Sequence, residues 1–371
     1  MTSRERLIAA MQGRAPDRVP LHVWGVPAWD DEWVRTRHPS YGPVIEATRE
    51  YGDYRATWSA PAGTFLSAGE VATTSQQVDH ADWVETITTM HTPGGDLRAR
   101  YLGSKRGLPG MQMEFWVKTL EDADRALSLP YVPLHSGEQE ALLQGFREME
   151  ALLGNRGVVG VNIWSSPISY LHDLMGSELL AIWSIEARGT IQRLLDVFLE
   201  RALDRLDGLI AAGVGPLFVS GGHEYATPPL HSTQDFREFV VEPERQIIRR
   251  VHEAGGILHV HCHGPLNAVL EDIAEIADVL HPIEAPPLGD VELADAKRRL
   301  GGRVCIEGNV QIGDVYALPT PQLVEAVKRA IDGGAPGGGF ILCPTASPYT
   351  EVLTDLTVRN YVAMIETAAS R

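Results

Sequence analysis

Short apolar runs alternate with longer amphipathic stretches through the last two-thirds of the chain. Stretches with helical spacing lie at 178–212, 233–253, 265–277, 291–300 and 321–332. The apolar runs between and around them, rich in β-branched residues, lie at 158–163, 216–220, 256–261, 279–283, 303–307 and 339–343. Strands that alternate with helices form βαβ units, whose strands pair in parallel. The pattern predicts a parallel sheet surrounded by helices.

One more apolar run, at 18–24, precedes these units and adds a further strand. Together they indicate an α/β fold, a (β/α)8 TIM barrel, with residues 1–371 as a single domain. An open, doubly wound sheet is the alternative. No Gly-x-Gly-x-x-Gly motif opens any predicted helix, so the barrel is favoured.

The segment 25–130 does not follow this alternation. Residues 84–91 and 96–102 alternate in polarity around a Thr-Pro-Gly-Gly turn, which is typical of a β-hairpin. We interpret 25–130 as an inserted, aromatic-rich segment that caps the barrel mouth. Its tryptophans are Trp29, Trp33, Trp58, Trp83 and Trp116.

Composition narrows the class of protein. The 371 residues include 32 basic and 49 acidic side chains, and the net charge of −17 argues against nucleic acid as the main partner. No apolar run reaches about 18 residues and no signal peptide is evident, so we expect a cytoplasmic protein without membrane contact. The acidic surface is compatible with a homodimer. Three cysteines, too few for a disulfide framework, favour metal binding or chemistry.

Potential metal ligands follow three of the predicted strands. His261 and His263 are two residues apart, so in an extended segment their imidazoles point the same way. Glu284 follows the next strand and Cys343 follows the last one. Because barrel enzymes place reacting groups at the carboxyl ends of their strands, all four should face one mouth. Imidazole, carboxylate and thiolate together suit Zn²⁺.

Two neighbouring residues could replace one of these ligands. His259 is two residues before His261, so its side chain should point to the same face of the strand. It lies deeper in the strand, however, and could be a core residue or a support for the ligands. Cys262 lies between the two histidines, so its side chain should point to the opposite face, toward the helices. Spacing alone leaves this choice open.

His223 and Glu224 are candidate catalytic residues. They follow the strand at 216–220 after two glycines, whose backbone bends tightly enough to bring both side chains to the mouth. Glu224 could anchor a substrate or carry a proton, with His223 beside it. A loop ion pair or a helix cap explains the same residues equally well.

Candidate substrate-binding residues also lie near predicted strand ends. Trp24, Trp164 and Tyr349 could line an aromatic pocket for a methoxylated ring or a quaternary amine, although aromatic side chains are more often core. Asn309 and Gln311 could bind a substrate oxygen, and turn formation is the alternative for both.

These motifs resemble the uroporphyrinogen decarboxylase superfamily, and within it the zinc-dependent, cobalamin-linked methyltransferases. Residues 2–20 are similar to the opening helix and strand of those proteins, and 167–176 to a middle motif. The ligand spacing also resembles the zinc site of cobalamin-independent methionine synthase, which has a His-x-Cys pair, then Glu, then Cys. Here His263 replaces the first cysteine, which leaves one thiolate fewer.

The resemblance implies Zn²⁺ and a cobalamin carried by a separate corrinoid protein. It implies methyl transfer between a small methoxylated or N-methylated compound and the corrinoid. The alternatives are transfer from a methylcorrinoid to a thiol, a decarboxylase or lyase of the same superfamily, and a non-catalytic, metal-binding protein that docks a corrinoid protein. Porphyrin decarboxylation is disfavoured because the loop at 25–34 contains no arginine to hold substrate carboxylates.

Overall fold

A parallel sheet is the centre of the fold. The computed structural model describes residues 1–371 except 61–62, 68, 107–109, 134–135, 164–165 and 301. Over these residues the sheet has seven parallel strands, hydrogen-bonded in the order β1-β6-β7-β8-β9-β10-β11. The strands are β1 (Tyr54–Ser59), β6 (Gly157–Asn162), β7 (Leu217–Gly221), β8 (Ile257–His261), β9 (Val279–His281), β10 (Cys305–Val310) and β11 (Phe340–Pro344). Strands β6 to β11 overlap the six predicted runs, which confirms the α/β class.

The predicted strand at 18–24 forms only an isolated bridge. Leu21 pairs in parallel with Leu342 of β11, and the Leu21 carbonyl accepts a hydrogen bond from the Asp53 amide, just before β1. The segment therefore joins the two edges of the curled sheet. This closure gives the TIM-barrel-like fold that the sequence predicted.

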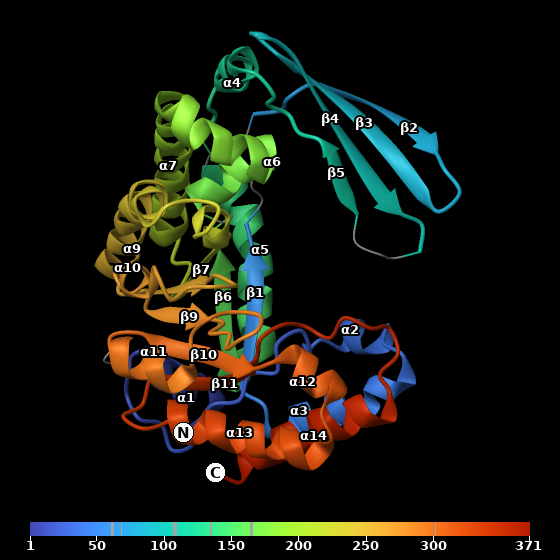
Figure 1. Ribbon diagram of the computed structural model, residues 1–371, viewed down its shortest axis with the longest axis vertical. Coiled ribbons are helices and arrows are strands. Elements are labelled where there is room, and N and C mark those ends of the chain that lie inside the picture. The colour runs from blue at the N-terminus through green and yellow to red at the C-terminus, as the bar shows by residue number, and fades with distance from the viewer. Residues whose placement is uncertain (61–62, 68, 107–109, 134–135, 164–165, 301) are drawn as a thin grey trace.

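Strand β1 was missed by the sequence analysis because it lies inside the segment interpreted as an insertion. It pairs with β6 in parallel, with Tyr54 opposite Gly157. The segment 25–130 thus contains one barrel strand, and the strands that follow form a separate antiparallel sheet. That sheet has the order β2 (Thr73–Asp79), β3 (Trp83–Thr92), β4 (Gly95–Ser104) and β5 (Met111–Glu114), and its β3–β4 pair is the predicted hairpin. Figure 1 shows it projecting from the body near α4 and α6. Its role as a cap of the mouth stays a prediction.

Helices lie around the barrel sheet, at its amino-terminal end and beside the inserted sheet (Figure 1). They are α1 (Ser3–Met11), α2 (Asp31–Arg35), α3 (Gly42–Tyr51), α4 (Leu120–Leu127), α5 (Ser136–Leu153), α6 (Pro167–Glu186), α7 (Arg188–Ala211), α8 (Thr233–Phe236), α9 (Glu242–Glu253), α10 (Leu270–Ile273), α11 (Leu293–Leu300), α12 (Ile312–Ala317), α13 (Thr320–Gly334) and α14 (Asp355–Ala369). The stretch predicted at 178–212 is divided between α6 and α7, and the stretch at 265–277 contains only the short α10. No helix of the described residues is long and apolar enough to cross a membrane.

Helix α1 closes the amino-terminal end of the barrel. Its Leu7, Ala10 and Met11 form a buried cluster with residues near the starts of the strands, including Leu217 and Ile257. Because this end is filled by apolar side chains, the polar groups of the strands collect at the opposite, carboxyl-terminal end.

A buried carboxylate ties α1 to the point of closure. Asp53 accepts a 2.7 Å hydrogen bond from Arg6 of α1 and a 3.0 Å bond from the Leu21 amide, and Arg18 lies 2.9 Å from its second oxygen. We expect Asp53→Asn to lower the free energy of unfolding by about 3–5 kcal/mol, because the neutral amide removes the buried carboxylate that faces both Arg6 and Arg18. Urea denaturation followed by circular dichroism measures this loss.

Asp17→Asn is the matched control for Asp53→Asn. Asp17 also pairs with Arg6, at 2.7 Å, but its side chain is 42% exposed. The control should cost less than about 1 kcal/mol, as exposed pairs do. Equal losses for the two variants would contradict the proposed role of Asp53.

Candidate metal centre and substrate pocket

Imidazoles from several strands gather at the carboxyl-terminal end of the barrel. His261 ends β8 and His281 ends β9, and their Nδ1 atoms lie 2.9 Å apart. Trp24 is the last residue of the closing segment, residues 18–24. Its indole stacks on the His281 ring with centroids 4.1 Å apart and planes 3° from parallel. Burial and the neighbouring His263 lower the pKa of His261 to about 3. Its imidazole is therefore neutral near pH 7 and keeps a nitrogen lone pair for bonding.

Glu307 of β10 is the hydrogen-bonding centre of this end of the barrel. Its carboxylate is bonded to His22 Nδ1 and lies 2.6 Å from His259 Nε2 and 3.5 Å from Arg55 Nε. Burial alone would raise the pKa of Glu307, but the charge of Arg55 and the bonds to both histidines hold it well below 4.5. The carboxylate is therefore ionised, and it joins side chains from β1, β8, β10 and the closing segment.

Cys343 of β11 lies next to this carboxylate. Its Sγ is 3.8 Å from His22 Nδ1 and 3.7 Å from His281 Nε2. The side chain is fully buried, and burial together with the nearby Glu307 raises the pKa of the thiol well above 9.0. Cys343 therefore stays protonated unless a cation compensates for the negative charge of the thiolate.

One group of potential metal ligands stands out in the part of the chain that the structure describes. Ligand atoms of His22, Glu307 and Cys343 all lie within 4.8 Å of one another, and all three residues are buried. Imidazole, carboxylate and thiol form a donor set that zinc accepts. Glu307 already balances the charge of Arg55, however, and a metal ion would compete with this ion pair.

Three of the four predicted ligands are linked by pairwise contacts, but their ligand atoms do not all lie within 4.8 Å of one another in the described part of the chain. His263 Nδ1 lies 3.1 Å from Glu284 Oε2, and the rings of His261 and His263 meet edge to face with centroids 4.7 Å apart. Cys343 contacts His281 and His22 instead, and neither of these is in the predicted set. His281 thus stands between Cys343 and His261, since it contacts both.

The two rival ligands have other environments. His259 is fully buried and bonded to Glu307 through Nε2. Cys262 is fully buried within the hydrophobic core, and burial raises the pKa of its thiol well above 9.0. His259 is therefore held by Glu307, and Cys262 is a residue of the hydrophobic core.

The two candidate catalytic residues differ in their accessibility. His223 is fully buried, and its Nε2 lies 3.2 Å from Glu244, which also accepts a 3.0 Å hydrogen bond from Ser220. Burial lowers the pKa of His223, but Glu244 outweighs this effect and raises it above 6.5. Oxygen Oε2 of Glu224 is buried without a hydrogen-bond partner among the described residues. Glu224 can therefore still accept a hydrogen bond, whereas His223 is fully buried beside the carboxylate of Glu244.

The predicted substrate-binding residues are dispersed. Asn309 and Gln311 line a separate cavity of about 300 Å³ beside α11 and α13. Tyr349 is 63% exposed and stacks on Tyr316. Trp164 lies outside the described residues. Of the aromatic candidates, Trp24 is the one within the histidine cluster.

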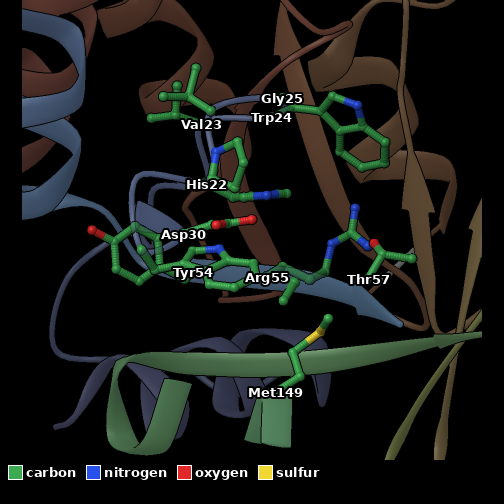
Figure 2. Close-up of a pocket in the computed structure, with 13 residues that line it drawn as sticks. His22, Val23, Trp24, Gly25, Asp30, Tyr54, Arg55, Thr57 and Met149 are labelled. Carbon is green, nitrogen blue, oxygen red and sulfur yellow. The ribbon is translucent and has the colours of Figure 1, made fainter. Parts of the chain in front are cut away.

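A cavity of about 390 Å³ lies beside this cluster, between the closing segment, β1 and α5 (Figure 2). Its walls are largely aromatic and apolar, and they include two charged residues, Arg55 and Asp30. Its volume falls in the usual range for small-molecule sites. The lining residues are His22, Val23, Trp24, Gly25, Val26, Pro27, Trp29, Asp30, Tyr54, Arg55, Ala56, Thr57 and Met149.

Comparison with protein families identifies the chain. Residues 133–370 match the family model described as uroporphyrinogen decarboxylase (URO-D). The chain belongs to the uroporphyrinogen decarboxylase family. A comparison of this URO-D family protein with curated protein sequences finds no match.

Solved structures support the fold assignment of this URO-D family protein. A methyltransferase from Methanosarcina mazei is similar over 100% of this chain and 99% of its own, with a TM-score of 0.62 and 17% sequence identity. A 3-keto-D-glucoside 4-epimerase from E. coli has 13% identity and a TM-score of 0.34, covering 69% of this chain and 97% of its own. At these identities the likeness to the methyltransferase concerns the fold, and the epimerase score is too low to support an argument.

The sequence analysis missed four residues at the centre of this URO-D family site. His22, His281 and Glu307 all lie in or at the ends of predicted apolar runs, so their position near strand ends was a signal that could have found them. Arg55 gave no such signal, because its strand lies in the segment interpreted as an insertion.

Replacing Glu307 tests its role as the centre of the cluster. We expect Glu307→Gln to lower the free energy of unfolding at pH 7 by about 3–5 kcal/mol, because the neutral amide cannot balance the buried charge of Arg55. Glu284→Gln is the control, since Glu284 bonds the more exposed His263 and should cost about 1 kcal/mol. Urea titration of both variants gives the two values.

The same variant predicts a difference in pH dependence. The folded pKa of Glu307 lies well below its unfolded value of about 4.3, so its stabilisation is complete above that pH and is lost as the pH falls further. Wild type should therefore lose more stability than Glu307→Gln between about pH 5 and about pH 3. An equal loss of stability in the two proteins over this pH range would contradict the assignment.

Proposed function

We propose that this URO-D family protein is a zinc-dependent methyltransferase that moves a methyl group from a small methylated compound to a corrinoid carried by a separate protein. The observation that carries the proposal is the series of contacts from Glu284 through His263, His261 and His281 to Cys343 at the carboxyl-terminal end of the barrel. The methyltransferase-like fold is consistent with it.

We assign zinc to His261, His263, Glu284 and Cys343. His263 contacts both Glu284 and His261, and His281 contacts both His261 and Cys343. Glu307 is less suited to hold a metal because its charge is balanced by Arg55. When bound, zinc supplies Lewis-acid chemistry, which polarises an ether oxygen or lowers the pKa of a thiol.

The remaining residues of the site would bind and orient the donor. Glu224 has a buried oxygen without a hydrogen-bond partner among the described residues, so it can accept a bond from a substrate hydroxyl or deliver a proton to the departing oxygen. His223 would position Glu224, its neighbour in the chain, through its contact with Glu244. Trp24 shields the histidines by stacking on them.

Zinc content tests the ligand assignment. The full chain, purified without a chelator or a histidine tag, should contain about one zinc ion per molecule by elemental analysis. Cys343→Ser and His263→Ala should each remove most of it, because each deletes one of four ligands. His22→Ala should retain the metal.

The opposite pattern would locate the metal elsewhere. Loss of zinc from His22→Ala with retention in His263→Ala would contradict our ligand set and favour His22, Glu307 and Cys343. Glu325→Gln, on the exposed face of α13, is a control outside the site, and its zinc content should equal that of wild type.

Visible spectroscopy tests the reaction. With cob(I)alamin and a methoxylated aromatic donor, wild type should produce the spectrum of methylcobalamin, and Cys343→Ser should reduce the rate by at least about a hundredfold. Glu325→Gln, on the exposed face of α13, should retain the wild-type rate.

Other outcomes would select the alternative functions. Formation of a thioether from methylcobalamin and a thiol, without demethylation, would reverse the direction of transfer. Release of carbon dioxide in the absence of cobalamin would contradict methyl transfer and favour a decarboxylase.

A further inference from the structure

Arg55 is a buried cation with unused hydrogen-bond donors on the wall of the cavity beside the histidine cluster. Its side chain is only 2% exposed, and Figure 2 shows it extending from β1 beside Thr57, toward the Trp24 ring. Its Nε and Nη1 atoms are buried without a hydrogen-bond partner among the described residues, and the nearest carboxylate oxygen, of Glu307, is 3.5 Å from Nε. Buried donors without acceptors are costly, so a ligand oxygen here would be stabilised.

The same cavity is poorly suited to a cationic ligand. The indole of Trp24 already stacks on His281, and the Cζ atom of Arg55 lies 4.5 Å from the ring centroid. A quaternary ammonium would need a free aromatic face, and at this ring it would also meet the charge of the guanidinium. This disfavours an N-methylated cation as the ligand.

The other charged residue on the wall does not compensate for Arg55. Asp30 is the N-cap of α2, where its Oδ1 accepts hydrogen bonds of 2.9 Å from the Glu32 amide and 3.0 Å from the Trp33 amide. Trp29 and Tyr54 add aromatic surface to the cavity, and Met149 adds apolar surface. The cavity thus combines the unused N–H donors of Arg55, which also lies beside Glu307, with aromatic and apolar walls.

We infer that this cavity binds an aromatic carboxylate, whose carboxylate accepts hydrogen bonds from Arg55 and whose ring lies against Trp29 and Tyr54. The inference rests on the proposed function in one respect, that this ligand is the methyl donor. The donor class is then a methoxylated aromatic acid. A guanidinium and a carboxylate form paired, charge-assisted hydrogen bonds, which explains why an arginine occupies this position.

Calorimetry with three matched probes tests the charge requirement on the unmodified full chain. The probes are 4-methoxybenzoate, the neutral 4-methoxybenzamide and the cationic 4-methoxyphenyltrimethylammonium. The acid should bind about ten- to a hundredfold more tightly than the amide, as expected for a charge-assisted hydrogen bond, and the cation should bind most weakly.

Variants identify the residue responsible. Arg55→Gln should abolish the preference for the acid over the amide. Arg55→Lys, which keeps the charge beside Glu307 if the glutamine variant fails to fold, should reduce the preference because the planar fork is lost. Arg37→Gln is the matched control, since Arg37 also lies over a tryptophan, 4.9 Å from Trp33, but does not line the cavity.

A metal ion could also attract a carboxylate, and Cys343→Ser separates the two explanations. The preference for the acid should persist in this variant if Arg55 is the anchor, and loss of the preference would assign it to the metal and overturn the inference. Equal binding of acid and amide by wild type, tightest binding of the cation, or an unchanged preference in Arg55→Gln would each overturn it as well.

Failure of the inference and failure of the proposed function give different results. If cobalamin is never methylated but 4-methoxybenzoate binds through Arg55, the proposed function is wrong and the proposed carboxylate site is correct. If cobalamin is methylated from neutral or cationic donors while the acid shows no preference, the function stands and the inference is wrong.

Discussion

The buried carboxylate of Glu307 is the constraint on which the carboxyl-terminal end of the barrel depends. A charge removed from water is stable only when nearby groups replace the lost solvation. Here Arg55, His22 and His259 do so, and they come from β1, the closing segment and β8. Parts of the chain far apart in sequence therefore have to meet at one point, and the sheet has to curl for them to reach it.

The need to stabilise the Glu307 carboxylate also decides which side chains of the candidate site are available to a ligand. Glu307 bonds His22 Nδ1 and His259 Nε2, and both of these histidines are buried. The half-buried imidazoles farther along the strands, His261 and His263, are therefore the ones that a ligand can reach. The thiol of Cys343 is left in an environment that favours its protonated form until a cation arrives. The same carboxylate balances one charge of Arg55 while leaving some of its N–H groups without acceptors.

The sequence alone predicted the parts of the structure that follow from local pattern. Strands β6 to β11 and the hairpin of β3 and β4 were found because their apolar runs and turn residues are contiguous. Strand β1 was missed because its alternation is short and it lies beside an inserted sheet, so only the pairing with β6 reveals it.

For the candidate site, spacing predicted that His263 and Glu284 would meet, since both follow neighbouring strands. It could not predict that Cys343 would contact His22 and His281. That contact depends on the curvature of the sheet and on the path of the closing segment, and both are tertiary properties.

The closure of the barrel has a consequence for the order in which the chain can fold. Leu21 bridges to Leu342, and α1 shares its buried cluster with Ile341, so the first and last parts of the barrel complete each other. During synthesis the first twenty or so residues emerge long before β11 exists to receive them. Contacts of such large sequence separation also slow folding, because a long loop must close first. The apolar side chains of the amino-terminal segment are therefore fully covered only after β11 has been synthesised.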